Sequence, residues 1–223
     1  MLTLEIMKAM WPQGNARVPG LVEGIVSSAP AVFTKYGLNN DLLIAHAMAQ
    51  FSHECGAGTE MVEKIHYTAD RACQVWDNRF SNPADCYTKV GSSEGDPDFY
   101  KKLINYVYGG RYGNRPGTDD GTTFIGRGLS QVTFRGNYET LGKTLGLDLV
   151  GHPELVNDPA HALECGVADF IQCGCLPFAQ ADDVRGVTQK LNGGHEGLDE
   201  RKAWLARWKA ALASSGISMQ AAT

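Results

Sequence analysis

Long apolar runs, an excess of positive charge and paired metal-ligand motifs are missing from this sequence, and each absence excludes a class of protein. No stretch approaches the roughly eighteen apolar residues that a membrane-spanning helix needs. The amino terminus lacks the basic start and apolar run of an export signal, so we expect a soluble protein made without a signal peptide. The formal net charge of −5 provides no general attraction to nucleic acid, and no such partner is expected.

Cysteine is too sparse for a disulfide scaffold in a chain of 223 residues, so we expect mostly free thiols among Cys55, Cys73, Cys86, Cys165, Cys173 and Cys175. Cys173-Gly-Cys175 lacks both the C-x-x-C spacing and the second pair of a zinc site. A zinc-peptidase motif would need histidine where Ala57 stands. We therefore expect neither metal nor cofactor.

Helix signals recur along the chain, and 43% hydrophobic residues are enough to bury a good-sized core. Capping residues, apolar periodicity and terminating glycines predict a mainly α protein with helices at 41–54, 160–173, 184–192 and 199–213. Residues 77–99 and 109–128 are dense in Gly, Pro, Asn, Asp and Ser, which predicts loops or short hairpins. The second of these stretches is a natural cleft wall.

Two glutamates, Glu54 and Glu63, lie nine residues apart on either side of a glycine-spaced turn. On a continuous helix they would point to opposite faces. The segment Gly56-Ala57-Gly58 can adopt positive φ angles that fold the chain back beside the helix end. Cooperation between the two carboxyl groups is therefore possible, although both could also be ordinary surface carboxylates.

Glycosidic bond cleavage uses such a pair, with one carboxyl protonated and the other ionised. Apolar neighbours disfavour the charged form of Glu54, which makes it the candidate acid, whereas Glu63 lies beside Lys64 and His66 and is the candidate base. A cysteine amidase is a second interpretation.

That interpretation would use Cys55 as a nucleophile with His53 or His66. Adjacent residues on a helix point about 100° apart and do not simply pair. The two histidines could equally be structural.

Five segments in order, FSHECGAG, VEKIHYTA, YGGRYGN, DGTTFIGRGLSQVTFRGNY and VTQKLNGGHEGLDERKAW, resemble glycoside hydrolase family 19, the chitinase family that also includes phage endolysins. The resemblance runs from about residue 38 to 208. It implies a lysozyme-like, two-lobed helical domain with a central substrate cleft and little β structure. The whole chain, 1–223, would be one catalytic domain with a loop-rich lobe at about 66–128 and no separate binding module.

The resemblance also implies an inverting mechanism, in which the two carboxyl groups lie roughly 6.5–9.5 Å apart to admit a water. Glu54 would protonate the glycosidic oxygen and Glu63 would activate that water. The other implied roles are water positioning for Thr133, sugar binding for Gln131, Asn137, Asn192, Tyr67 and Tyr138, and bracing of the cleft by Arg201. Asn192 could instead only terminate its helix, the tyrosines could only pack, and Arg201 could be a structural ion-pairing group.

The sequence departs from the family pattern at Cys55, where the family has serine, and at Ala57, where it has glycine. The groove-extending loops of the plant enzymes are not recognisable. Chitin and peptidoglycan are both β-1,4-linked N-acetylhexosamine polymers, so the carboxylates do not choose between them. Because no export signal is evident, we favour a monomeric phage endolysin acting on peptidoglycan. It would be made in the host cytoplasm and released to the periplasm through a separate pore-forming protein.

The last predicted helix is basic and amphipathic, a pattern that can contact an anionic outer membrane or simply pack on the core. Its basic residues are Arg201, Lys202, Arg207 and Lys209, and its apolar ones are Trp204, Leu205, Trp208 and Leu212. Three further interpretations stay open: a chitinase, a lytic transglycosylase with a single catalytic glutamate, and a non-catalytic glycan-binding protein.

Overall fold

The computed structural model describes residues 1–65, 67–91 and 96–220, with side chains up to residue 214. Within these ranges the chain forms helices and isolated β-bridges but no extended strand. The helices are α1 (Leu4–Met10), α2 (Leu21–Tyr36), α3 (Asp41–Glu54), η1 (Gly56–Gly58), α4 (Ala69–Val75), α5 (Pro83–Val90), α6 (Phe99–Tyr108), α7 (Asp120–Thr123), α8 (Arg135–Leu145), η2 (Pro153–Asn157), α9 (Ala162–Gln172), α10 (Leu176–Gln180), α11 (Val184–Asn192) and α12 (Leu198–Gln220). The predicted mainly α fold class is confirmed.

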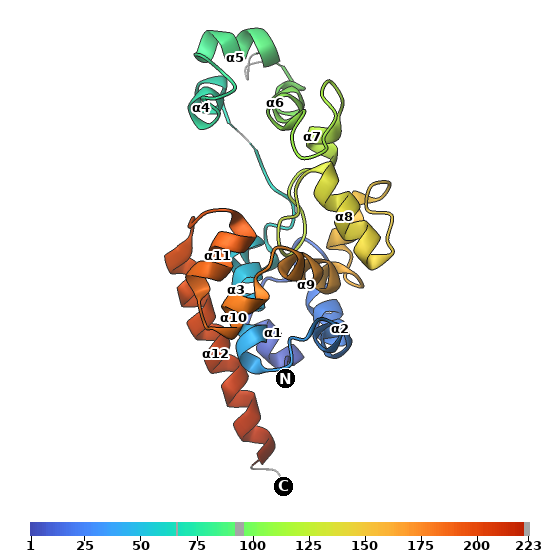
Figure 1. The fold of residues 1–223 in the computed structure, drawn as a ribbon, viewed down its shortest axis with the longest axis vertical. Coiled ribbons are helices and arrows are strands. Elements are labelled where there is room, and N and C mark those ends of the chain that lie inside the picture. The colour runs from blue at the N-terminus through green and yellow to red at the C-terminus, as the bar shows by residue number, and fades with distance from the viewer. Residues whose placement is uncertain (66, 92–95, 221–223) are drawn as a thin grey trace.

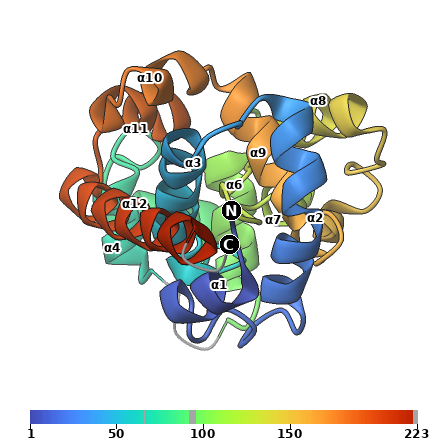
Figure 2. The same ribbon diagram turned by 90° about the horizontal axis from the view of Figure 1, so that it is seen from below.

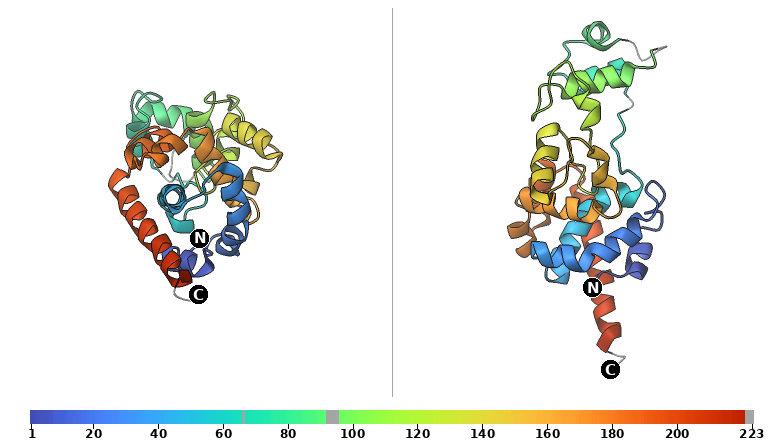
Figure 3. Two further views of the ribbon diagram at one scale, coloured as in Figure 1. Left: turned by 60° about the horizontal axis from the view of Figure 1, so that its bottom comes forward. Right: turned by 90° about the vertical axis from the view of Figure 1, so that its right-hand side faces the viewer.

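The helices divide into two lobes (Figure 1). Helices α4, α5 and α6 form the upper lobe, and α1, α2, α3 and α9–α12 form the lower one, with α8 beside their junction. An extended segment leads from the end of α3 up to α4. The side view in Figure 3 shows the same separation, with α12 projecting beyond the body of the lower lobe.

Helix α3 is the centre of the lower lobe. Asn40 caps it by accepting a hydrogen bond from the Leu43 amide, and ten of its fourteen residues are buried. Figure 3 shows α3 nearly end-on, surrounded by the other helices of the lobe, and Figure 2 shows α12 running alongside it. Because α3 ends at Glu54, the packing of the whole lobe fixes the position of this carboxyl group.

Ser52 joins three helices in the core. Its hydroxyl accepts hydrogen bonds from the indole N–H groups of Trp11 and Trp208, each at 2.8 Å, and donates to the Met48 carbonyl at 2.7 Å. Both indoles are buried. Since Trp208 lies two helical turns after Arg201, this contact also sets the rotation of α12 that directs Arg201 toward α3.

Replacing Ser52 with alanine is expected to lower the free energy of unfolding by about 2–4 kcal/mol, because two buried indole N–H groups lose their acceptor. Urea unfolding followed by circular dichroism would measure the change. Ser27→Ala on the exposed face of α2 is the matched control, with an expected change within about 0.5 kcal/mol. Equal stabilities of the Ser52 variant and the control would contradict this account of the core.

The upper lobe has its own hydrophobic core, formed by residues of α4, α5 and α6, such as Cys86, Phe99 and Leu103, and by Phe80 from the segment between α4 and α5. The prediction that 77–99 is a loop is wrong at its centre, since α5 occupies Pro83–Val90. The turn-forming residues there act as helix-start signals: Asn82 caps the Asp85 amide, and Pro83 takes the first position of the helix. The predicted loop-rich lobe is thus a small helical lobe.

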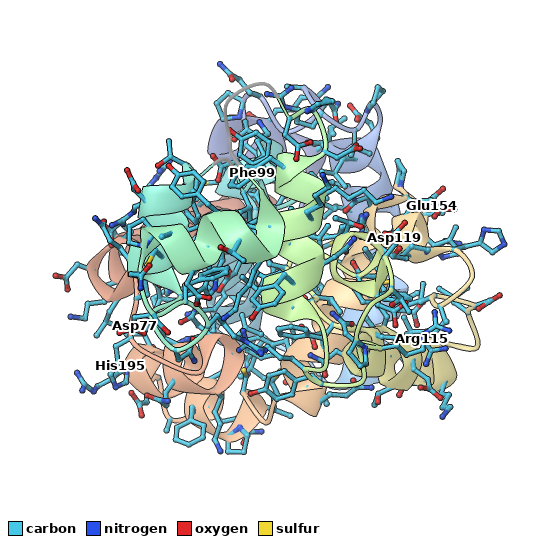
Figure 4. All side chains as sticks on the ribbon, turned by 90° about the horizontal axis from the view of Figure 1, so that it is seen from above. Asp77, Phe99, Arg115, Asp119, Glu154 and His195 are labelled. Carbon is cyan, nitrogen blue, oxygen red and sulfur yellow. The ribbon has the colours of Figure 1, made fainter. Side chains whose placement is uncertain are left out.

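The stretch 109–128 is mostly irregular, as predicted, apart from the short helix α7. Within this stretch the Arg115 guanidinium donates to the Asp120 carboxylate through hydrogen bonds of 2.8 and 2.9 Å. Viewed from above, Arg115 and Asp119 lie on the same flank of the molecule, beside α6 (Figure 4). No hairpin forms within its described residues, but Arg127 pairs through β-bridges with Val62 on one side and Val132 on the other. These bridges bring the segment after α3 alongside the segment before α8.

Helix α12 continues to Gln220 rather than ending near 213 as predicted. Its apolar face packs on the core, because Leu205, Trp208 and Leu212 are buried, and its Lys209 pairs with Asp182 at 2.6 Å. The core-packing alternative is thus confirmed for the described side chains of this helix, and the outer-membrane contact stays a prediction. None of the helices in the described part of the chain is long and apolar enough to cross a bilayer.

Candidate active site

A cleft of about 1110 Å³ is lined by residues from both lobes. It brings together seven of the eight residues predicted to bind or process substrate, which are Glu54, Glu63, Tyr67, Gln131, Thr133, Asn137 and Asn192. His66, which the sequence placed beside Glu63, lies outside the described residues. The two glutamates therefore share one cleft.

Glu54 is held from the lower lobe by Arg201. The guanidinium donates to Glu54 Oε1 at 2.7 Å, to Gln50 Oε1 at 2.6 Å and to the Glu196 carbonyl at 3.1 Å. Arg201 is 1% exposed and the Glu54 side chain 13% exposed. Gln50 and Glu54 lie one turn apart on the same face of α3. One buried cation thus orients both polar side chains of that face, and the predicted bracing role of Arg201 is realised through direct contact with Glu54.

The sequence argument placed only apolar groups around Glu54, and that picture is wrong. Apolar neighbours do cover α3, but Arg201 approaches from α12, 147 residues away in sequence. The group next to Glu54 Oε1 is therefore a cation, at 2.7 Å, and not an apolar side chain. The acid role of Glu54 therefore has to be argued from its position in the cleft rather than from an apolar environment.

The predicted turn after α3 does fold the chain back. Gly56, Ala57 and Gly58 have φ angles of 54°, 52° and 87°. An added Cβ on Gly58 would lie 2.7 Å from the Gly14 carbonyl oxygen, so this position requires glycine. Ala57 holds a left-handed conformation at a cost of about 1–2 kcal/mol, which the family glycine would not carry. The turn directs Glu63 back to the cleft.

Glu63 is held by the upper lobe and by the segment before α8. Tyr108, the last residue of α6, donates to Glu63 Oε1 at 3.0 Å, and the Gly126 amide donates to Oε2 at 3.3 Å. The Glu63 amide returns a hydrogen bond of 2.8 Å to the Gly126 carbonyl. An added Cβ at Gly126 would lie 2.8 Å from Gln131 Oε1 and 3.2 Å from Glu63, so a side chain at the first glycine of G-R-G would displace Gln131 and crowd Glu63.

Tyr108 was not identified from sequence as a site residue, although it opens the YGGRYGN segment. Burial and the adjacent Glu63 carboxylate raise the pKa of Tyr108. The phenol therefore stays protonated at neutral pH and acts as a hydrogen-bond donor to Glu63.

Thr133 lies in the same cleft with its hydroxyl proton already committed, because it donates to the Gln131 carbonyl at 2.9 Å. Its lone pairs are the part of the hydroxyl that can bind a water. Gln131 has a φ of 54° and donates its amide to the carbonyls of Glu60 and Gly128 at 3.0 and 3.3 Å. Asn137 donates to the Thr133 carbonyl at 2.8 Å. Gln131 and Asn137 thus also hold the backbone of this wall.

Tyr138 is the predicted sugar-binding residue that the structure contradicts. Its side chain is 0% exposed, and its hydroxyl donates to the Ile125 carbonyl at 2.9 Å. Tyr138 lies on the face of α8 that packs against Phe124, so it supports the wall from behind without reaching substrate. Tyr67 does line the cleft, paired with Trp76 at 5.5 Å between ring centroids.

Asn192 ends α11 and also lines the cleft, and its sugar-binding role stays a prediction.

The comparisons with known proteins agree with this geometry. No protein-family model matches the chain. A glycosyl hydrolase family 19 domain-containing protein of Haemophilus influenzae (strain ATCC 51907 / DSM 11121 / KW20 / Rd) is 31% identical over 189 residues, which cover 84% of this chain and 88% of that protein. The chain belongs to glycosyl hydrolase family 19. It is accordingly a glycoside hydrolase, and the predicted family is confirmed.

Solved structures show the same fold at lower identity. Chitinase C from Streptomyces griseus HUT6037 superposes with a TM-score of 0.61 at 17% identity, covering 95% of this chain and 76% of that one. A bacterial family 19 chitinase superposes with a TM-score of 0.59 at 18% identity, covering 94% of each chain. These likenesses establish the two-lobed helical fold of the family for this chain.

Cys55, the departure from the family serine beside Glu54, does not form a nucleophilic site. The thiol is fully buried and donates to the Phe51 carbonyl at 3.0 Å. Burial raises the pKa of Cys55 to about 12, so a thiolate is strongly disfavoured. The cysteine amidase interpretation is therefore wrong, and the thiol replaces the serine hydroxyl with a local hydrogen bond.

Asp169, on α9, is an acidic residue of the cleft that the sequence analysis missed. Burial raises its pKa to about 6, and the nearby Glu54 carboxylate acts in the same direction, while Ser130 and Cys173 oppose the shift. The Cys173 thiol lies 3.8 Å from Asp169 Oδ1. No periodicity marks Asp169 as functional, because it falls on the polar edge of an otherwise apolar helix.

Replacing Asp169 with asparagine is expected to stabilise the protein above pH 6 and to change little at pH 4. The folded-state pKa lies above the ordinary value of 3.8, so the native state binds the proton more tightly and wild-type stability falls as pH rises from about 4 to 6. Asparagine does not titrate, and the difference should reach roughly 2–3 kcal/mol at pH 7.

Urea unfolding at pH 4, 5, 6 and 7 would measure this difference, with Asp77→Asn as an exposed control at the edge of the molecule (Figure 4). A difference between the Asp169 variant and wild type that does not change with pH would show that Asp169 ionises freely in the folded protein.

Proposed function

We propose that this glycoside hydrolase cleaves β-1,4 bonds between the N-acetylhexosamines of bacterial peptidoglycan by an inverting acid/base mechanism. The observation that carries the proposal is that two glutamates, each held by a different lobe, line one cleft. Glu54 is fixed through Arg201 on the lower lobe, and Glu63 through Tyr108 on the upper lobe. A glycan strand lying between the lobes would meet one carboxyl group on each side.

In the proposed reaction Glu54 gives its proton to the glycosidic oxygen as the bond from that oxygen to the anomeric carbon breaks. The resulting Glu54 carboxylate is paired with Arg201, which stabilises the charge that proton donation creates. Arg201 thus acts on the product side of the acid step. Solvent restores the proton after the leaving sugar departs.

The attacking water would lie between Glu63 and Thr133. The Thr133 hydroxyl proton is used by the Gln131 carbonyl, so its oxygen accepts one hydrogen of the water, and Glu63 accepts the other. Both hydrogens are then engaged and a lone pair is left to attack the anomeric carbon. As the new C–O bond forms, a proton passes to Glu63, and the product carries the inverted configuration.

Three basic side chains of the cleft support peptidoglycan as the substrate. Lys64, Arg111 and Lys190 line it beside five acidic residues, and chitin has no ionised group for the three cations to bind. Peptidoglycan carries carboxylates on its stem peptides. Chitin is the competing substrate, because the similar solved structures are named chitinases and the same catalytic pair would serve either polymer.

The endolysin role remains a prediction that follows from this substrate. The monomeric enzyme would reach the wall after release through a separate pore-forming protein. Expression in a bacterial host with and without a pore-forming protein should give lysis only when both are present. Lysis without the pore protein would contradict the predicted route.

Digestion of purified peptidoglycan and of chitin, with the products analysed by mass spectrometry, tests the reaction. Peptidoglycan fragments with hydrated reducing ends are the expected result, and the terminal sugar would identify the bond that is cut. Anhydro ends would indicate a lytic transglycosylase. Products from chitin alone would favour a chitinase, and binding without products a glycan-binding protein.

A further inference from the structure

One wall of the cleft carries a cluster of three side chains to which the sequence analysis assigned no role: Arg111, Tyr112 and Phe134. The Tyr112 and Phe134 rings lie 4.9 Å apart at an angle of 45°. The Arg111 guanidinium lies over both, at 5.8 Å from the Tyr112 centroid and 5.3 Å from that of Phe134. Tyr112 is 66% exposed and lines the cleft, so its ring is accessible to a ligand there.

The backbone holds this cluster in a strained conformation. Tyr112 and Phe134 have φ angles of 41° and 73°, which non-glycine residues rarely adopt. The Gly136 amide donates to the Tyr112 carbonyl at 2.9 Å, and an added Cβ on Gly113 would lie 2.9 Å from the Gly136 nitrogen. The backbone at Tyr112 and Gly113 is thus in close contact with the backbone at Gly136. This contact places the Tyr112 ring in the cleft. Strain of this kind is concentrated at binding sites.

The cluster adjoins the proposed base. The rings of Phe134 and Tyr108 lie 5.2 Å apart, and Tyr108 donates to Glu63. A sugar ring resting on Tyr112 would therefore belong to the same glycan strand that reaches the two glutamates. The flat C–H face of a pyranose packs on an aromatic ring, and the phenol hydroxyl can remain in water.

Arg111 differs from the other arginines that pack at or near this site. Arg201 is paired with Glu54, and Arg115 with Asp120. Among the residues that the structure describes, no ion pair or side-chain hydrogen bond engages the Arg111 guanidinium, which lies over the two rings and close enough to Tyr108 to oppose the rise that burial causes in the pKa of that phenol. A guanidinium stacked on aromatic rings keeps its edge N–H groups free, and these bind a carboxylate in bidentate fashion.

We propose that Arg111 and Tyr112 form a subsite for a substituted sugar of peptidoglycan, in which the Tyr112 ring supports the pyranose and Arg111 binds a carboxylate of the attached stem peptide. The inference rests on the proposed function and deepens it. Neutral chitin offers the sugar face but no carboxylate. Tyr112 therefore acts on both polymers, whereas Arg111 distinguishes between them.

Binding to a catalytically silent Glu54→Gln protein tests this subsite without depending on cleavage. Three ligands of equal sugar number are compared by calorimetry: peptidoglycan fragments with free stem carboxylates, the same fragments with those carboxylates amidated, and neutral N-acetylglucosamine oligomers. Arg111→Gln should raise Kd about tenfold for the first ligand only. The difference in Kd between wild type and Arg111→Gln should shrink as the salt concentration is raised.

Tyr112→Ala should raise Kd by roughly five- to tenfold for all three ligands, and Tyr112→Phe should restore wild-type binding. Tyr87→Ala is the matched control, since Tyr87 is also exposed but lies on α5, away from the cleft lining.

An equal loss of affinity for all three ligands in Arg111→Gln would overturn the assignment, because it would mean that Arg111 only supports the Tyr112 ring. Unchanged affinities in both the Arg111 and Tyr112 variants would also overturn it. Failure of the proposed function would give a different result from failure of the subsite. In that case the wild-type protein would release no products from peptidoglycan, while the carboxylate-dependent binding could still be present.

Discussion

Replacing Glu54 with glutamine is expected to lower kcat on glycan strands by roughly 10²–10⁴-fold, because the amide has no proton to give to the leaving oxygen. Glu63→Gln should lower kcat by a comparable factor, since it removes the acceptor for the proton of the attacking water. Neither change alters side-chain volume much. Reducing-end release under saturating substrate would measure both effects, and circular dichroism would show that the fold is retained.

Glu60→Gln is the matched control for the two glutamate variants, because Glu60 lines the same cleft but is exposed, and its side chain is not part of the proposed reaction. It should keep nearly full activity. NMR of the first products adds a second test, since an inverting enzyme releases the α-anomer from a β-linked strand. A β-anomer, or an active Glu63→Gln protein, would contradict the paired mechanism.

Replacing Arg201 with methionine is expected to lower the free energy of unfolding by about 3–5 kcal/mol. The substitution leaves Gln50 Oε1 without its donor and Glu54 as an unpaired, largely buried carboxylate. Activity should fall as well, since the cation that receives the developing Glu54 charge is lost. Urea unfolding at pH 7 gives the stability, and initial rates give the activity.

Arg207→Met provides the control on the same helix. Arg207 is exposed and stacks on Trp204 at 4.1 Å, so its replacement should cost no more than about 1 kcal/mol. The double variant Arg201→Met/Glu54→Gln should recover part of the stability lost in Arg201→Met, because no carboxylate is then left unpaired. Additive losses in the double variant would show that the two side chains are not energetically coupled.

Local signals were sufficient for the elements on which the site is built. Asn40 and the glycines after Glu54 predicted the limits of α3, and Asp183 and Gly193 those of α11, because capping and termination depend on neighbouring residues. The helix predicted at 160–173 is found at Ala162–Gln172. Local rules were less successful at 77–99, where the residues that form turns also start helices.

The family motifs placed seven of the predicted residues in one cleft, because a resemblance carries information about positions that local rules do not. Tyr138 shows the limit of inferring a site residue from such a resemblance. A tyrosine next to Asn137 reads as a cleft residue in sequence, but consecutive helical residues point about 100° apart. In the fold Asn137 faces the cleft and Tyr138 faces the core.

The sequence by itself determined the family, the helical fold class and the turn that separates the two glutamates, all of which are encoded over short ranges. Only the tertiary structure decided what surrounds each carboxylate. Arg201 reaches Glu54 from 147 residues away, and Tyr108 reaches Glu63 from 45 residues away. Such contacts depend on the packing of whole helices, which Ser52 and its two indole donors hold in place. The charge environment of the site is therefore a property of the assembled lobes.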